Sequence, residues 1–170
     1  MTKSQLISLA GGILSGTTLE RVKLLQEIID AGDPGKRGTW SYYAQRFQDW
    51  IAGKRGPAFS IFRAGGNSKL PFYAFSSLPG FDCPGAGDCL FNEAGEFGKG
   101  FCYSFRAWRY PAAFFRQVQN SILIREDRQT LARAFQDIPA GKDWLRRVVR
   151  LYVDGDFDSA RTFAFWMDQI

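Results

Sequence analysis

Three aspartates occupy alternate positions in the stretch RLYVDGDFDS, residues 150–159. Asp154, Asp156 and Asp158 repel one another when all three are ionised, so the arrangement needs a physical reason. One explanation is a polar turn that leaves a strand, with Asp158 as the N-cap of a following helix. The other is that Asp154 and Asp156 bind Mg²⁺ or Mn²⁺ and position water against a phosphodiester. The sequence leaves both explanations open.

Arginines interleaved with aromatic residues form a second group with possible chemistry. The stretch FRAWRYPAAFFRQVQN, residues 105–120, carries Arg106, Arg109 and Arg116 among Phe, Trp and Tyr, and it ends in Asn120. On a helix, Arg109, Arg116 and Asn120 fall near one face because seven and four residues separate them. Arginine beside aromatic rings suits phosphates and unstacked bases, although a solvated helix face explains the same pattern.

A Gly-rich connection, RAGGNSK (63–69), is a third candidate. Asn67, Ser68 and Lys69 would hold a phosphate together with backbone N–H groups of the loop. The spacing differs from that of a P-loop, since two residues separate Gly66 from Lys69, and an ordinary hairpin loop is the alternative.

The composition excludes several kinds of chemistry. The 170 residues contain no histidine, which removes Ser-His-Asp and Cys-His nucleophiles and His-ligated zinc. The three cysteines, Cys83, Cys89 and Cys102, are odd in number and match no common metal spacing, so structural thiols are favoured over an iron–sulfur site. The net charge of +5 suits a polyanion without requiring one. Apolar runs are too short to span a bilayer and the N-terminus is a poor signal peptide, which predicts a cytoplasmic protein.

The elements that must position these residues are predicted in the order α-α-β-β-α-α-β-α. Helices are predicted at 17–31, 39–52, 111–123, 127–137 and from Asp158 or Ser159 onward, strands at 57–63, 70–77 and 145–153, and one long irregular loop at 78–100. This order predicts an α+β fold, a single mixed-sheet domain with an N-terminal helical part (1–56) and a sheet-containing part (57–170).

The last predicted strand is expected to carry the acidic residues to a ligand-binding edge. Its residues VVRLYV, 148–153, are nearly all apolar, which predicts a place in the sheet interior. Asp154 and Asp156 would then emerge at the carboxyl end of the strand, where open sheets bind their ligands.

Several of these stretches together resemble the gene-product-88-like proteins of phages and plasmids. The resemblance lies in CPGAGDC (83–89), CYSFRAWRYPAAFFRQVQN (102–120), and RLYVDGDFDS (150–159) with FWMDQI (165–170). Gly155-Asp156-Phe157 is its most distinctive part, and the residues before 65 lie outside it. Within this family the sequence is similar to plasmid fertility-inhibition proteins.

The resemblance implies a ParB/sulfiredoxin-like fold and a role in suppressing conjugative transfer, including T-DNA export, through a type IV secretion system. It also implies ATPase and DNase activity on the transferred DNA at the inner face of the secretion channel, with ATP joining the metal ion as a cofactor. By position it points to Asp156 and Arg150 for catalysis, and to Arg106, Arg109 and Asn120 as phosphate contacts. The Gly-Cys-His-Arg stretch of sulfiredoxin is absent, which argues against sulfinic-acid repair.

A non-enzymatic role is the alternative. Exposed aromatic and arginine side chains also suit a protein interface, through which the chain would bind the secretion coupling protein and block it.

Overall fold

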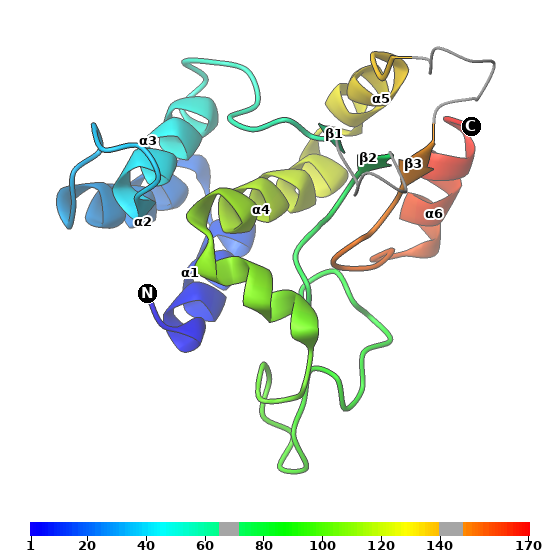
Figure 1. The fold of residues 1–170 in the computed structure, drawn as a ribbon, viewed down its shortest axis with the longest axis horizontal. Helices are drawn as coiled ribbons and strands as arrows, with labels where there is room; N and C mark the ends of the chain where they lie inside the picture. Colours follow the sequence, from blue (N-terminus) through cyan, green and yellow to red (C-terminus); the bar gives the residue numbers. More distant parts are fainter. Residues whose placement is uncertain (65–71, 140–147) are drawn as a thin grey trace.

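A computed structural model of the chain describes residues 1–64, 72–139 and 148–170, and it shows a mixed α+β arrangement (Figure 1). The predicted fold class is confirmed at this level. The elements are helices α1 (Lys3–Ser15), α2 (Thr18–Asp30), α3 (Trp40–Ile51), α4 (Pro111–Glu126), α5 (Arg128–Gln136) and α6 (Ala160–Met167), the 3₁₀ helix η1 (Tyr103–Arg109), and strands β1 (Arg63–Ala64), β2 (Tyr73–Ala74) and β3 (Val149–Arg150). In these ranges no helix is both long and apolar enough to cross a bilayer.

Side-chain caps fix where most helices begin. At α2 the side chains of Thr17 and Glu20 form a reciprocal capping box, which confirms the predicted start. Asp127 accepts from the N–H of Thr130 at 3.1 Å and begins α5. Of the two predicted caps for the last helix, Ser159 holds the position, accepting from the N–H of Thr162 at 3.2 Å. Local hydrogen bonds of this kind are readable from sequence because both partners are near neighbours.

Helix α1 was not predicted, although its sequence holds the signal. Thr2 and Gln5 form another capping box at its start, and Leu6, Leu9 and Ile13 share its buried face. The helix packs against α2, α4 and η1. The N-terminal residues therefore belong to the core of the fold.

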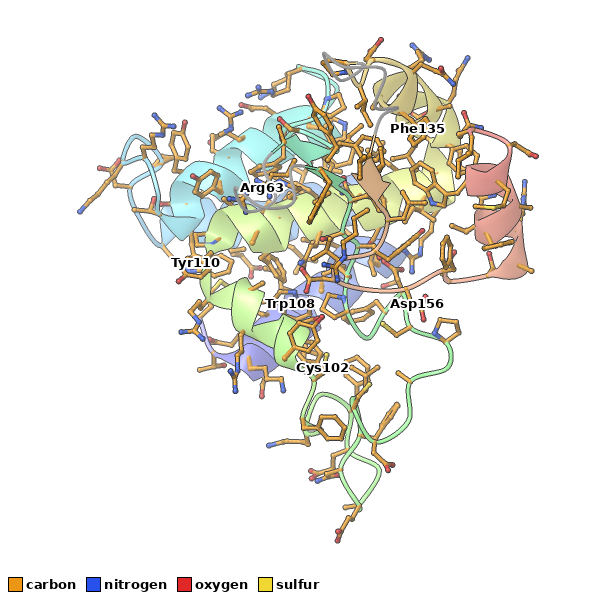
Figure 2. The ribbon with its side chains drawn as sticks, turned by 45° about the vertical axis from the view of Figure 1, so that its right-hand side comes forward. Arg63, Cys102, Trp108, Tyr110, Phe135 and Asp156 are labelled. Carbon is orange, nitrogen blue, oxygen red and sulfur yellow. The ribbon has the colours of Figure 1, made fainter. Side chains whose placement is uncertain are left out.

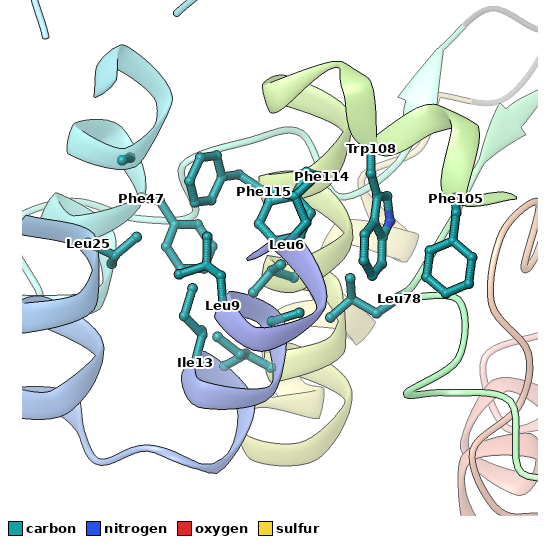
Figure 3. Packing of buried hydrophobic residues seen from close by; sticks show 14 of the residues in the cluster. Leu6, Leu9, Ile13, Leu25, Phe47, Leu78, Phe105, Trp108, Phe114 and Phe115 are labelled. Atoms are coloured by element: carbon teal, nitrogen blue, oxygen red, sulfur yellow. The ribbon is translucent and has the colours of Figure 1, made fainter. Parts of the chain in front are cut away.

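Helix α4 crosses the middle of the molecule, with α1–α3 on one side and the strands and α6 on the other (Figure 1). Residues near its two ends belong to two separate apolar clusters. Phe114 and Phe115, near its start, pack with Phe47 of α3 and Trp108 of η1 (Figure 3). Complete burial of a phenylalanine ring contributes about 2–3 kcal/mol to folding, so these contacts dominate the first cluster.

The second cluster lies under the strands. Leu123 and Ile124, near the end of α4, pack with Phe75 and with Trp166 of α6. The ring centroids of Phe75 and Trp166 lie 5.1 Å apart at a steep angle, which suits edge-to-face packing. Residues of α4 thus join both halves of the core.

Among the described residues the sheet is shorter than predicted; residues 70–71 and 145–147 of the predicted strands lie outside them. Along the predicted strand 57–63, side chains take the place of a neighbouring strand. In the predicted strand 57–63, the N–H and C=O of Phe59 bond the side-chain amide of Gln119, each at 2.9 Å. The carbonyl of Ile61 accepts from Asn120 at 3.2 Å. Backbone groups that α4 satisfies in this way need no strand partner. In the part of the chain that the structure describes, regular pairing covers two residues in each strand.

Strand β3 lies at the edge of the described sheet, whose order is β1-β2-β3. The prediction that it occupies the sheet interior is wrong: Val149 is half-buried and Arg150 is exposed. The apolar side chains of this stretch pack onto the second cluster from one side. An edge strand needs apolar residues on one face alone, which a continuous apolar run does not reveal.

A bulge interrupts the parallel pairing of β2 with β3. Phe75 donates its N–H to Arg150 at 3.0 Å and accepts at its carbonyl from Val153 at 2.9 Å. A regular parallel ladder would use the N–H of residue 152, so one residue is extra. That residue, Tyr152, has a left-handed φ of +54°, and a bulge of this kind redirects the side chains that follow it.

Candidate functional site

The acidic loop begins where β2 and β3 end together. Beyond the bulge one further backbone hydrogen bond joins the two segments, the N–H of Ser77 donating to the carbonyl of Asp154 at 3.0 Å, but it does not continue the ladder register. The structure thus places Asp154 and Asp156 after the carboxyl end of β3, as the sequence predicts. Figure 2 shows Asp156 on the loop that leads from β3 toward α6.

Asp154 points into the protein. Its Oδ2 accepts from the side-chain amide of Gln117 at 3.0 Å, and Gln117 in turn accepts from the indole N–H of Trp108 at 2.7 Å. The hydroxyls of Ser104 and Ser76 also bond this carboxyl. Burial raises the pKa of Asp154 above its ordinary 3.8, and these hydrogen bonds with the charge of Arg150 oppose that rise. Asp154 therefore keeps its proton to a higher pH than a free aspartate.

Asp156 points into solvent. Its Oδ1 accepts from the N–H of Phe157 at 2.7 Å, and its own N–H donates to the carbonyl of Asp82 at 3.0 Å. Burial raises the pKa of the neighbouring Cys83 thiol, and the charge of Asp156 adds to that effect. The backbone of Asp156 is thus anchored while its carboxylate stays accessible.

Gly155 makes the change of direction between the two acids possible. Its φ is +78°, and a Cβ at this position would overlap the Oγ of Ser77. A residue with a side chain would need both a strained backbone and a displaced Ser77. The Gly-Asp order of the motif therefore follows from close approach of the acidic loop to the end of β2.

The carboxyls of Asp154 and Asp156 face different environments, so they do not converge on one metal ion. Within the described ranges no three His, Cys, Asp or Glu side chains come together as a ready-made cage. Hydrogen bonds occupy the carboxyl of Asp154, whereas that of Asp156 is exposed. Mg²⁺ keeps several waters and often takes one or two carboxylates plus substrate phosphates. In that mode Asp156 would be the carboxylate ligand, whereas Asp154, the other predicted ligand, has its carboxyl hydrogen-bonded inside the protein.

The predicted arginines divide between two places. Arg150 acts electrostatically on Asp154, close to the acidic loop. Arg106 and Arg109 are exposed on η1, where the Nε of Arg109 donates to the carbonyl of Arg106 at 3.0 Å. A 3₁₀ helix has three residues per turn, so these two share an edge that is rotated away from Ser104, the residue that contacts Asp154. The structure brings Arg150 to the acids and leaves the η1 arginines on a separate edge.

Arg116 and Asn120 do not form an exposed face with Arg109, contrary to the sequence expectation. Arg109 precedes α4, and Asn120 is fully buried, its amide donating to the carbonyls of Ile61 and Ser76 at 3.2 and 2.8 Å. Arg116 is half-buried; burial and the charge of Arg63 lower its pKa. Asn120 therefore holds two backbone segments together, and its amide N–H groups are not available to a phosphate. Asn67, Ser68 and Lys69 lie outside the described residues.

Asp82 is the residue of this region that the sequence did not reveal. Its carboxylate is fully buried, pairs with Arg125, and accepts from the hydroxyl of Ser121 and, at 3.0 Å, from the N–H of Leu78. Its carbonyl holds the N–H of Asp156. Its place in the apolar stretch GFDC was a signal for burial. The sequence did not show what would pair with it, because its partner Arg125 lies 43 residues away.

The three cysteines are free and half-buried. The N–H of Cys102 donates to the carbonyl of Cys89 at 2.7 Å, and the sulfur of Cys83 accepts from the N–H of Gly80 at 3.4 Å. These contacts fold the long loop against the start of η1. The thiols and the backbone around them thus stabilise the loop that carries Asp82.

The chain is thus a small α+β protein in which an acidic loop follows a bulged parallel strand pair. The model of the family described as gene product 88 matches residues 48–170, and the chain belongs to this family. The match begins within α3, earlier than the resemblance in the sequence indicated, and leaves α1 and α2 outside it. No curated protein and no solved structure matches the chain.

Replacing Arg125 by alanine is expected to lower the free energy of unfolding by about 3 kcal/mol, because it leaves the buried carboxylate of Asp82 without its counter-charge. Urea denaturation measures the change. Arg133→Ala is the matched control: Arg133 is exposed on the neighbouring helix α5, and its loss should change stability by no more than about 0.5 kcal/mol. Equal effects of the two substitutions would contradict the role given to Asp82.

Asp154→Asn is expected to remove a pH dependence from stability. Because the folded state raises the pKa of this carboxyl above 3.8, its contribution to stability is complete below pH 3.8 and is lost as the pH rises through the raised pKa. Urea unfolding over this range should show the wild type losing stability relative to the variant as pH increases. Parallel pH profiles for the two proteins would show that Asp154 does not titrate in this way.

Proposed function

We propose that this chain is a plasmid- or phage-borne fertility-inhibition factor, similar to the oncogenic-suppression activity protein of plasmids. In this proposal it acts in the bacterial cytoplasm, at the inner face of a type IV secretion channel, and suppresses conjugative or T-DNA transfer. The ParB/sulfiredoxin-like fold that the resemblance implies is part of the same proposal. The observation that carries it is the Gly155-Asp156 turn, which exposes one carboxylate beside a second that the protein holds inside.

The proposed activity is hydrolysis of phosphodiester bonds in transferred DNA and of the phosphoanhydride of ATP. Mg²⁺ or Mn²⁺ bound beside Asp156 would polarise a phosphoryl group and make a bound water more acidic. The exposed carboxylate of Asp156 would bind this metal ion and so orient the substrate phosphate on it. Arg150 compensates negative charge near Asp154, and Asp154 holds the loop through Gln117 and the two serines. Arg106 and Arg109 contact the DNA backbone elsewhere along the strand.

A second candidate is a non-enzymatic inhibitor that binds the secretion coupling protein. The observation that favours it lies on α6, where Phe163 and Met167, one turn apart, are 49% and 43% exposed. Exposed apolar side chains at this spacing suit a helix face that docks into a partner.

Asp156→Ala tests the hydrolytic proposal. The variant should lose Mg²⁺-dependent nuclease and ATPase activity by at least about a hundredfold, the usual scale for removing a group that acts on the reacting centre. Its circular dichroism and thermal unfolding midpoint should stay those of the wild type, because the carboxylate contacts solvent. Activity is measured by digestion of labelled DNA and by release of phosphate from ATP, with and without a chelator.

Asp158→Ala is the control, since it removes the same charge two residues further on. The carboxylate of Asp158 accepts a long hydrogen bond from the hydroxyl of Ser159, at 3.4 Å. The Asp158→Ala variant should keep its hydrolytic activity. Wild-type rates in Asp156→Ala would rule out this residue as the centre of hydrolysis. Suppression of transfer that survives complete loss of hydrolysis would favour the coupling-protein inhibitor.

A further inference from the structure

An open cavity of about 350 Å³ lies between η1 and the first residues of the chain. Its walls combine Lys3 of α1 and Arg106 and Arg109 of η1 with the rings of Phe101 and Phe105. Figure 1 shows the N-terminal end of the chain beside η1. Lys3 lies outside residues 48–170, which the family model matches. One wall of the cavity therefore comes from the matched segment, and the other comes from residues that precede it.

The charge around this cavity is positive. The ammonium of Lys3 lies 4.4 Å from the centroid of the Phe105 ring, a cation–π contact that fixes it beside the cavity. Arg106 and Arg109 lie on the exposed edge of η1, and none of the described residues that line this cavity is an aspartate or glutamate. Nearby acids, Asp88 and Glu93, instead line a neighbouring cavity that also uses Phe101. An anionic ligand is therefore favoured on the η1 side of Phe101.

Exposed aromatic rings accompany these cations. Phe101, Tyr103 and Tyr110 are 79%, 66% and 63% exposed. Tyr103 shares its edge of η1 with Arg106 and Arg109, because three residues complete one turn. Large rings left in water beside cations have faces available for stacking with planar, negatively charged partners.

We propose that this surface, made of Lys3, Phe101, Tyr103, Arg106 and Arg109 and called the η1 edge below, binds single-stranded nucleic acid by stacking unpaired bases between phosphate contacts. The DNA strand as its occupant rests on the proposed function. A rise of about 2.0 Å per residue gives the seven residues of η1 a length of about 14 Å. That length matches about four stacked nucleotides at ~3.4 Å each. Duplex DNA hides the base faces that the rings require.

The η1 edge is distinct from the acidic loop. Ser104 contacts Asp154, whereas Arg106 and Arg109 are rotated onto another edge of the same 3₁₀ helix. A strand held on the η1 edge would therefore keep its affinity when the acidic loop is altered. This separation makes the two proposals independently testable.

The test measures fluorescence anisotropy of a labelled oligothymidylate with full-length protein over a salt series. Tyr103→Ala should weaken binding about tenfold and leave the salt slope unchanged, because it removes stacking and no charge. Arg106→Gln should weaken binding and reduce the slope of log K against log salt by about 0.7, the value for one phosphate contact on a single strand. Arg133→Gln, an exposed arginine on α5, is the charge-matched control and should bind as the wild type.

The outcomes separate this inference from the proposed function. Asp156→Ala that binds oligothymidylate normally but hydrolyses nothing supports both. A wild type that binds the strand through the η1 edge but hydrolyses no substrate supports the inference and overturns the hydrolytic proposal. Hydrolysis with wild-type binding in Tyr103→Ala and Arg106→Gln overturns the inference and the DNA contact given to Arg106, and leaves the hydrolytic proposal standing. Equal competition by the matching duplex also overturns it, because a duplex offers no unpaired bases and the surface would then bind phosphate alone. No binding of oligothymidylate at all overturns it as well and leaves a protein as the occupant of this surface.

Discussion

The fold depends on satisfying the polar side chains that α4 carries into the core. Gln117, Gln119, Asn120 and Ser121 are each no more than 3% exposed, in the middle of a helix whose two ends are packed with aromatic and aliphatic groups. An unsatisfied buried polar group costs about 1–3 kcal/mol. The segments on either side of the helix supply most of these partners: residue 59 bonds both ends of the Gln119 amide, and the carbonyls of residues 61 and 76 accept from the Nδ2 of Asn120. The buried Oδ1 of Asn120 has no partner among the described residues. Along residues 59–61 the helix therefore replaces a sheet ladder with side-chain hydrogen bonds.

The same helix determines how the acidic loop is displayed. Gln117 holds Asp154 inward, while Ser121 and Arg125 hold Asp82, whose carbonyl anchors the backbone of Asp156. One carboxyl is thus kept in a partly buried environment that raises its pKa, and the other is presented to solvent. Groups with such different environments can serve different roles although they are two residues apart. This difference between Asp154 and Asp156 arises because Gln117 of α4 holds Asp154 inward and Gly155 reverses the direction of the backbone between them.

The sequence predicted most helices and the location of the acids, but little of the sheet. Helix starts depend on near neighbours such as Thr17 and Glu20, whereas strand length depended on whether Gln119 would reach residue 59, sixty positions away. The helical spacing of Arg109, Arg116 and Asn120 was real in the sequence. The prediction that they share one exposed face was wrong, because Tyr110 separates η1 from α4 and because Asn120 points inward. Asp82 was missed since its charge partner is likewise distant in sequence. Nonlocal pairing was the missing information in each case.

Native-state hydrogen exchange of the Phe59 amide tests most directly whether α4 side chains replace a sheet partner. In the wild type this N–H should exchange slowly, because Gln119 accepts it at 2.9 Å. Gln119→Met, which keeps a side chain of similar length without the amide, should speed its exchange by about tenfold, the scale of one lost hydrogen bond. The Leu78 amide, held by Ser121 and Asp82, should stay protected. Fast exchange at Phe59 in the wild type, or equal protection in both proteins, would contradict the account.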